Sequence, residues 1–273
     1  MSGQGSAPAS LESVDAPAIE GSLRSPRDFP YWLVAIVAIL LWMGYLIATE
    51  SRYNIAYTRI IDGIGTTIRI TILGFLFALG LGLLAGLGRI SRNIVLRNLA
   101  TFYIEFIRGV PMLVLILMVA FVIVPRLANT FGLQNDAITK DTRMIIALSL
   151  IYGAYLGEVF RAGIESVPKG QMEAGRSVGM SHTQTMSRII LPQAVRNMIP
   201  AIGNDAIAML KDSSLASVLA VREITQQARL HVGTSFDADS TYLVLTLLYL
   251  TMTLSLSLVL SWYRRRLGLD DRG

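Results

Sequence analysis

The sequence has no cysteine and only two histidines among its 273 residues. Without cysteine, the chain forms no disulfide bonds and offers no thiolate ligands to a metal. His182 and His231 lie far apart, with no second ligand or carboxylate cluster nearby, so we expect neither a metal site nor catalytic residues. The phosphate-binding sequence Gly-Lys-Ser/Thr is also missing. The chain is therefore not expected to hydrolyse ATP itself.

Charged residues are scarce as well. They make up 16% of the chain, hydrophobic residues make up 53%, and the mean hydropathy is +0.54. A soluble domain carries about 25% charged residues. The net charge is +5, but the arginines cluster at the ends of apolar runs, where they orient helices in a bilayer. These proportions predict a membrane protein and argue against a nucleic-acid partner.

The apolar residues form six runs long enough to cross a bilayer as helices. They are residues 31–49, 64–88, about 100–124, 143–164, 193–210 and 242–262. In the second run, Gly82 and Gly86 leave room for another helix to approach closely. Residues 1–30 are rich in Ser, Ala, Pro and Gly and are predicted to be a disordered leader rather than a cleaved signal peptide. We expect an all-α, polytopic membrane protein with six transmembrane helices.

A polar stretch, residues 169–192, interrupts the apolar runs. It predicts a short helix ended by Gly179 in a left-handed conformation. Ser181 and Gln184 have the spacing of a capping box, which predicts a second helix, and Pro192 is expected to close the unit. A membrane protein that interrupts its spans with such a helical hairpin presents a docking surface. The alternative is a surface hairpin without a partner.

The spacing within this stretch resembles the EAA loop in the membrane subunits of ABC importers with the type I fold. The matching residues are Glu173, Ala174, Gly175, Gly179, Ile189, Leu191 and Pro192. Gly175 departs from the family pattern, which has a second alanine there. Both residues are small, so close packing is kept, although helix propensity falls by about 1 kcal/mol. The resemblance implies that these residues form the coupling helix, which fits a groove on a separate cytoplasmic ATPase.

Further motifs resemble the histidine, glutamine and arginine uptake branch of these permeases, which carries polar amino acids. They are Arg-Gly-x-Pro at 108–111, Glu-x-x-Arg at 158–161, Leu-Pro-Gln-Ala at 191–194 and Lys-Asp-Ser-Ser-Leu at 211–215. The resemblance covers residues 63–263, a permease domain with five spans. Residues 31–49 are then an extra N-terminal transmembrane helix, and residues 264–273 a cytoplasmic tail.

This resemblance implies the transmembrane subunit of an ATP-driven importer that moves a polar amino acid into the cytoplasm by alternating access. Its expected partners are a cytoplasmic ABC ATPase dimer, a second permease subunit, identical or homologous, and an extracytoplasmic amino-acid-binding protein. The ATPase would bind ATP and Mg, and we expect no cofactor on this chain. With the hairpin in the cytoplasm, six spans in the inner (plasma) membrane place both termini inside, where Lys and Arg are more frequent.

Charged residues within apolar runs are costly in lipid, so each is expected to face a partner or a cavity. Glu105 with Arg108, and Glu158 with Arg161, have the spacing of ion pairs on one helix face. The first pair lies near the inner surface, where an interfacial ion pair without a substrate role is the simpler interpretation. The second pair is a candidate for the substrate pathway, although its two side chains could also simply neutralise each other.

The remaining candidates for the substrate pathway lie in and after the fifth run, which Pro200 and Gly203 weaken. They are Asp205, Lys211, Asp212, Ser213 and Ser214. A broken helix that lines a cavity is where transporters bind polar substrates. An α-amino acid carries a carboxylate and an ammonium, so a cation, Lys211 or Arg161, beside a carboxylate, Asp205 or Glu158, would meet both ends. The alternative is that these groups are structural ion pairs.

An ion-coupled secondary amino acid transporter is the alternative function, because it also explains charges within the spans. Such a transporter would show inverted repeats and would need no docking loop. The sequence has no convincing internal repeat, and the 169–192 stretch would be unexplained. The sequence therefore favours the ABC importer.

Overall fold

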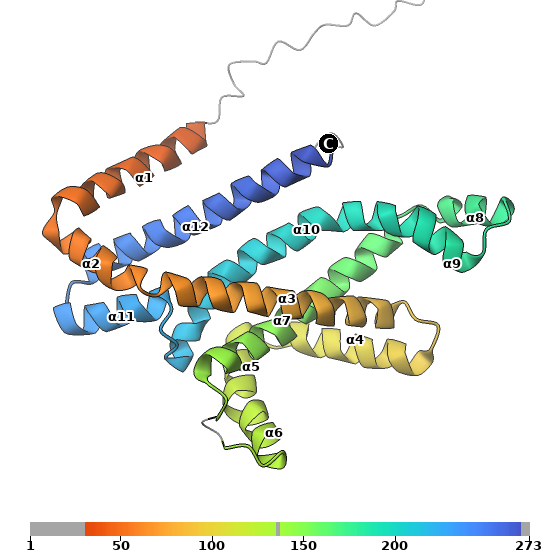
Figure 1. Ribbon diagram of the computed structural model, residues 1–273, viewed down its shortest axis with the longest axis horizontal. Coiled ribbons are helices and arrows are strands. Elements are labelled where there is room, and N and C mark those ends of the chain that lie inside the picture. The colour runs from red at the N-terminus through yellow and green to blue at the C-terminus, as the bar shows by residue number, and fades with distance from the viewer. Residues whose placement is uncertain (1–30, 135–136, 269–273) are drawn as a thin grey trace, which may run out of the picture. The chain divides into compact units, whose positions relative to one another are not determined.

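The computed structural model describes residues 31–134 and 137–268, and every regular element within them is helical (Figure 1). This confirms the predicted all-α class. The chain divides into two units, residues 1–39 and 40–273, and α1 (Tyr31–Thr49) runs across the division. The predicted leader, residues 1–30, and the last five residues of the predicted tail lie outside the described residues.

Four of the predicted runs coincide with long helices of the second unit. They are α3 (Ile64–Arg89), α7 (Lys140–Glu165), α10 (Leu191–Asp212) and α12 (Ala238–Arg266). Among the described residues, the stretches long and apolar enough to cross a membrane are Ser51–Arg89, Met112–Thr130, Lys140–Glu165 and Ala238–Arg266, and a shorter apolar helix covers Leu33–Thr49. The α10 helix is long enough but carries more polar residues, so the count of six spans stays a prediction.

The predicted third span is not one helix. The α4 helix (Ile94–Gly109) ends before Val110 and Pro111, which are both extended. Pro111 has no amide hydrogen and disfavours a helical conformation in the residue before it, so the single helix expected over residues 100–124 was wrong. The chain restarts as α5 (Met112–Met118), the π-helical turn η2 (Val119–Ile123) and α6 (Val124–Thr130).

A second proline is accommodated by this π-helical turn. In the i→i+5 register, the carbonyl of Ala120 would accept the amide hydrogen of Pro125, which does not exist. The guanidinium of Arg143, on α7, instead donates to the Ala120 oxygen at 3.1 Å. A charged side chain from another helix thus satisfies a backbone carbonyl that proline leaves without its usual donor.

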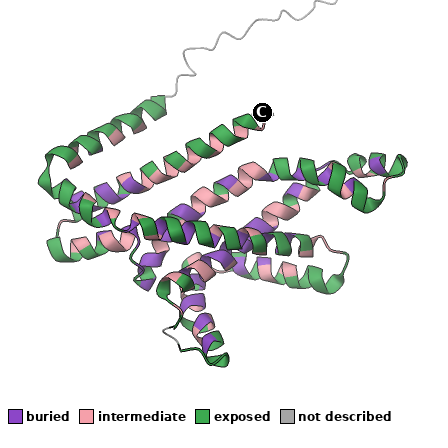
Figure 2. Ribbon diagram, viewed as in Figure 1, coloured by how far each residue is buried: buried purple, intermediate pink, exposed green. Residues whose placement is uncertain are grey.

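The centre of the second unit is the contact between α3 and α7. A Cβ atom on Gly82 would lie 2.6 Å from the Cβ of Leu156, and one on Gly86 would lie 2.7 Å from the Cβ of Phe160. The close approach predicted for Gly82 and Gly86 is therefore confirmed. Gly157 of α7 also faces this contact, where its own Cβ would lie 3.1 Å from Ala85. By contrast, α4 is exposed along most of its length (Figure 2).

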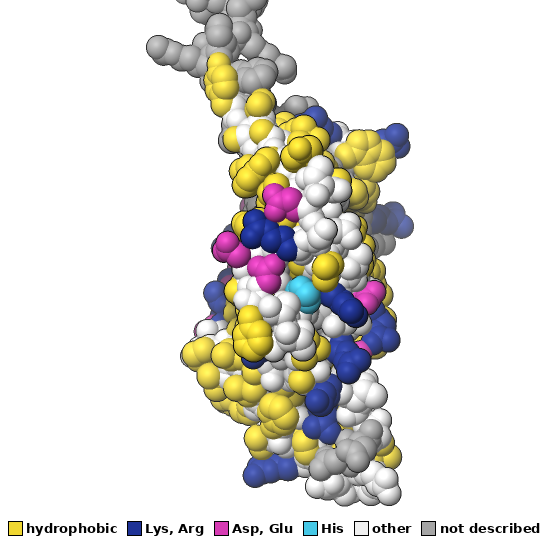
Figure 3. All heavy atoms as spheres, turned by 90° about the vertical axis from the view of Figure 1, so that its left-hand side faces the viewer, with side chains coloured by type: hydrophobic (Ala, Val, Ile, Leu, Met, Phe, Trp, Pro, Cys, Tyr) yellow, Lys and Arg dark blue, Asp and Glu magenta, His cyan; other side chains and the backbone are white. Residues whose placement is uncertain are grey.

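The opposite end of α3 meets two shorter helices, α2 (Ser51–Ile61) and α11 (Ile224–Ser235). Charged side chains of both signs gather at this end of the molecule (Figure 3). The first turn of α11 is capped by Glu223, which is fully buried and accepts the amide hydrogens of Thr225 and Gln226 at 2.8 Å each. Burial raises the pKa of the Glu223 carboxyl, although the backbone donors oppose that shift.

Candidate functional site

The predicted hairpin forms where α7 ends. The α8 helix (Lys169–Ser177) is followed by Gly179, whose φ is +86°, and by α9 (His182–Thr185). The amide of Met180 donates to the Gly175 carbonyl and the amide of Gly179 to the Arg176 carbonyl, each at 3.1 Å. These two bonds are the Schellman motif that ends a helix at a left-handed glycine. The conformation predicted for Gly179 is confirmed.

The second helix of the hairpin begins as predicted. The amide of Gln184 donates to the Ser181 hydroxyl at 3.2 Å, and the Gln184 side chain accepts the Ser181 amide at 2.8 Å. Both halves of the capping box are therefore present. The end of α8 and the start of α9 are therefore both satisfied by local hydrogen bonds within the turn.

The two arms of the hairpin touch at Gly175, the position that departs from the family pattern. A Cβ atom there would lie 2.5 Å from the Cγ2 and 2.9 Å from the Oγ1 of Thr185, which is fully buried. An alanine would therefore push Thr185 away, contrary to the expectation that alanine and glycine pack alike here. The glycine on one arm and the threonine on the other fit as a pair.

The expectation that Pro192 closes the hairpin was wrong. The π-helical turn η4 (Met186–Ile190) follows α9, and α10 continues directly from it with Pro192 in its first turn. Proline is tolerated in a first turn, where its missing amide hydrogen is not needed. The amide of Leu191 donates to the Met186 carbonyl, and the Gln193 side chain donates to the Ile189 carbonyl at 2.8 Å. The hairpin is thus joined to α10 without a break.

Most of the predicted coupling residues face outward. Glu173, Ala174 and Pro192 are exposed, Leu191 is 43% exposed, and Ile189 is half-buried. The prediction omitted Val178, which is 77% exposed beside Gly179 at the tip of the hairpin. An isolated valine between Ser177 and Gly179, in an otherwise polar segment, is the sequence signal that would have found it.

The predicted pair of Glu158 and Arg161 forms, but as part of a larger network at the hairpin end of α7. Arg161 pairs with both Glu158 and Glu165. Arg89, at the end of α3, donates to Glu158 at 2.6 Å and to Glu105 at 2.9 Å. The spacing of Glu105 and Arg108 had suggested that these two residues pair. In the structure, Glu105 pairs with Arg89 instead. Both Glu158 oxygens are engaged by guanidinium groups.

The predicted substrate-pathway residues of α10 lie away from the Glu158 network, and Asp212 contacts α7 at another level. The Tyr152 hydroxyl donates to Asp212 at 2.6 Å. Tyr152 lies on α7 six residues before Glu158, a distance of about 9 Å along the helix. Asp205 precedes Asp212 by two turns, which places both on the same face of α10. The Oδ2 atom of Asp205 is buried and has no hydrogen-bond partner among the described residues. Lys211 is exposed.

The structure therefore separates the candidates into two groups. No hydrogen bond or ion pair within residues 31–134 and 137–268 joins Glu158 or Arg161 to Asp205 or Lys211. The Ser213 hydroxyl is buried and donates to the Leu210 carbonyl at 2.7 Å, and Ser214 is half-buried. In the part of the chain that the structure describes, no three His, Asp or Glu side chains are grouped to hold a metal ion.

Comparisons with known proteins agree with this architecture. The chain is 38% identical over 210 residues to the probable amino-acid permease protein YxeN of Bacillus subtilis, covering 77% of this chain and 92% of that protein. It is 34% identical over 212 residues to the glutamine transport system permease protein GlnP of Escherichia coli, covering 78% and 94%.

Solved structures give the same result. A chain of an amino acid ABC transporter with histidines has a TM-score of 0.70 and 34% identity to this chain, and the match covers 81% of this chain and 98% of that one. A chain of the MetNI methionine ABC transporter, at 19% identity and a TM-score of 0.60, shares the fold over 76% of this chain and 95% of its own length. Residues 78–269 match the family described as binding-protein-dependent transport system inner membrane component. The resemblance noted in the sequence is confirmed, and the chain belongs to this family of ABC importer permeases.

Proposed function

We propose that this chain is the transmembrane subunit of an ATP-driven importer that moves a polar amino acid into the cytoplasm. Its similarity to amino-acid and glutamine permeases supports the substrate class. The observation that carries the proposal is the hairpin of residues 169–192, which is largely exposed, capped at the turn between α8 and α9 and continuous with α10. Such a rigid element outside the spans is suited to receive a movement and pass it to α7 and α10.

The partner of the hairpin is a cytoplasmic ABC ATPase. Val178 and Gly179 at the tip would enter its groove first, because Val178 is exposed and nothing lies within 4 Å of a Cβ on Gly179. The pairing of Gly175 with Thr185 keeps the two arms from shearing. The other coupling residues in the proposal are Glu173, Ala174, Ile189, Leu191 and Pro192.

The rest of the assembly follows from this role. The ATPase dimer binds ATP and Mg, so this chain carries no cofactor and no ATPase site of its own. A second permease subunit, identical or homologous, and an extracytoplasmic amino-acid-binding protein complete the importer. The hairpin faces the cytoplasm, both termini lie on the same side, and the membrane is the inner (plasma) membrane.

For the substrate pathway we favour the residues of α10 and its outer end over those of α7. Glu158 and Arg161 are already neutralised by Arg89 and Glu165, which supports a structural role. The buried Oδ2 of Asp205 has no donor among the described residues, so it is available to an ammonium group. The other residues of the proposed pathway are Lys211, Asp212, Ser213 and Ser214. An ion-coupled secondary transporter needs no docking hairpin, so we do not propose that function.

The decisive test of coupling is Gly179→Arg. A side chain at a φ of +86° is strained by about 1 to 2 kcal/mol, and it would also be excluded from a groove that contacts the tip. The variant is expected to insert normally and to lose amino-acid-stimulated ATP hydrolysis in vesicles, with copurified ATPase measured alongside. Gly233→Arg, on α11, is the control, because a Cβ there also meets nothing within 4 Å. Normal stimulation in Gly179→Arg would falsify the proposed coupling interface.

The orientation is tested with single cysteines, because the native chain has none to remove. Cysteines at Ser91 and Ser181 are expected to react with an impermeant maleimide only after the membrane is opened. A cysteine at Gln134, which is exposed after α6, is expected to react in intact cells. Labelling of Ser181→Cys from outside would reverse the topology and remove the basis for a cytoplasmic ATPase partner.

A further inference from the structure

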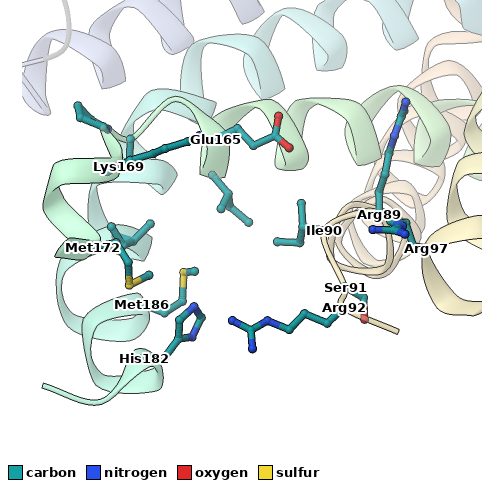
Figure 4. Close-up of a pocket in the computed structure, with 14 residues that line it drawn as sticks. Arg89, Ile90, Ser91, Arg92, Arg97, Glu165, Lys169, Met172, His182 and Met186 are labelled. Carbon is teal, nitrogen blue, oxygen red and sulfur yellow. The ribbon is translucent and has the colours of Figure 1, made fainter. Parts of the chain in front are cut away.

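A large open groove lies between the hairpin and the turn that joins α3 to α4 (Figure 4). Its volume is about 1090 Å³. One wall comes from the end of α3 and the following turn, and the other from the end of α7, the start of α8 and the α9–η4 segment. The groove is distinct from the exposed hairpin tip and from the polar residues of α10.

The rim of this groove is basic. Arg92, Arg97 and Lys169 line it, all three are exposed, and none has a carboxylate partner within the described residues. The Arg92 side chain extends across the opening toward His182 (Figure 4). The acid of the groove, Glu165, is already paired with Arg161. Exposed cations that line one opening without carboxylate partners repel one another, so an anion placed among them is favoured.

The floor of the same groove is apolar. It is formed by Ile90, Ile164, Val167, Met172, Met186 and Ile190. Val167 and Ile190 are buried, and Met172 and Met186 pack against them in one cluster. The groove also begins where α3 and α7, both part of candidate membrane spans, end at Arg89 and Glu165, so we expect it to lie near the boundary between hydrocarbon and water. Its occupant must therefore combine a negative charge with an apolar body at that boundary.

We propose that the groove binds an anionic phospholipid of the adjacent leaflet. Its phosphate would lie among Arg92, Arg97 and Lys169, and the start of an acyl chain would cover the apolar floor. Basic pockets between helices at the membrane surface are suited to such headgroups. An acidic segment of the ATPase would satisfy the rim, but its carboxylates would leave the floor uncovered. That the leaflet is the cytoplasmic one rests on the proposed function, whereas the binding itself does not.

The bound lipid would hold the hairpin against the membrane surface. The groove lies between the α3–α4 turn and both arms of the hairpin, so a lipid that fills it ties that turn to the hairpin. A hairpin fixed in this way transmits a push from its tip to α7 and α10 rather than swinging freely. The lipid is therefore a structural part of the element that we assign to coupling.

The test uses the purified full-length chain and native mass spectrometry. Phosphatidylglycerol and phosphatidylethanolamine with the same acyl chains are titrated in parallel. The wild type is expected to prefer phosphatidylglycerol. The double variant Arg92→Gln/Lys169→Gln is expected to lose that preference by about tenfold or more, since each basic residue near a membrane surface contributes about fivefold. The matched control is Arg126→Gln/Arg229→Gln, which removes two exposed charges outside the groove and is expected to keep the preference.

Further variants separate the proposal from its competitors. Arg92→Lys/Lys169→Arg keeps the charges and is expected to keep the preference, while gel filtration checks that each variant is folded. An equal preference in the wild type and the Gln double variant overturns the proposal. So does a Gln double variant that retains the lipid but fails to copurify with the ATPase, because the groove would then bind protein. The lipid measurement uses the permease alone, so it stands or falls separately from amino-acid transport.

Discussion

Two acidic residues on helices predicted to cross the membrane, Glu158 on α7 and Asp205 on α10, have opposite surroundings. Both oxygens of Glu158 are bound by guanidinium groups, from Arg89 and Arg161, and the side chains of Glu158 and Arg89 are 24% and 20% exposed. The buried Oδ2 of Asp205 has no donor within the described residues. The same chemical group is therefore fully engaged in one place and available in the other.

This difference is the basis on which we assign Glu158 a structural role and Asp205 a place in the proposed substrate pathway. A partly buried ion pair costs desolvation and returns little net stability, but removing one partner leaves the other charge uncompensated. Glu158 thus links α3 to α7 at the hairpin end through its ion pair with Arg89. A buried carboxylate oxygen without a donor is itself unfavourable, so a site that retains one is suited to a ligand that brings the donor. An ammonium group is such a donor.

The largest expected effect is that of Asp205→Asn on transport. The change removes the charge and keeps the size, so a charge-assisted hydrogen bond to the substrate is lost. Uptake into vesicles is expected to fall about tenfold to a hundredfold, because such bonds are worth about 1.5 to 3 kcal/mol. Copurified ATPase is expected to stay at the wild-type level.

The matched control is Asp239→Asn, which removes a carboxylate from an exposed position in the first turn of α12. It is expected to transport normally. If Asp205→Asn also transports normally, Asp205 does not contact the substrate. If Asp205→Asn loses assembly in proportion to uptake, the carboxylate is structural and the contrast with Glu158 disappears.

Glu158→Gln is expected to have the opposite effect to Asp205→Asn, lowering stability rather than uptake. Arg89 and Arg161 would lose the charged acceptor that they share, because the glutamine amide is neutral and keeps only one acceptor oxygen. Stability is expected to fall by about 1 kcal/mol, since both guanidinium groups remain partly solvated. The midpoint of thermal unfolding in detergent would drop by a few degrees, while uptake per assembled complex stays close to normal. Glu50→Gln, in an exposed pair with Arg52, is the control and is expected to change neither quantity. A selective loss of uptake in Glu158→Gln would return this residue to the substrate pathway.

The sequence predicted one part of the molecule much better than the other. The hairpin was predictable because its signals are local: the left-handed Gly179 and the capping box of Ser181 with Gln184 depend on neighbours within a few residues. The Arg89 to Glu158 ion pair spans 69 positions, and no local pattern indicates which helices meet. For that reason the spacing of Glu105 and Arg108 suggested a pair that does not form.

The two errors about proline have a common physical cause. Pro111 precedes a new helix where the apolar run predicted one continuous helix, whereas Pro192 stands inside a helix that it was expected to end. Hydropathy does not report backbone register, and a proline is harmful only where its amide hydrogen is needed. The π-helical turn before Pro192 shifts the hydrogen-bond register, because the Leu191 amide donates to the Met186 carbonyl five residues earlier. Such a shift depends on packing and is not visible in the apolar pattern.

The smallest expected effect is that of Tyr152→Phe, which tests how Asp212 is used. Tyr152 is 2% exposed, and its hydroxyl donates to Asp212 at 2.6 Å, so phenylalanine fills the same space and removes only that donor. If the hydroxyl holds Asp212 in position beside the substrate path, the concentration of amino acid needed for half-maximal uptake is expected to rise about fivefold, the loss of one hydrogen bond of about 1 kcal/mol. Maximal uptake and thermal stability would change little.

The double variant Tyr152→Phe/Asp212→Asn tests whether the two residues act as a unit. If they do, Asp212→Asn is expected to raise the half-maximal concentration less in the Tyr152→Phe background than it does alone. Additive effects, or an unchanged half-maximal concentration with lower thermal stability, would show that this bond only packs α7 against α10.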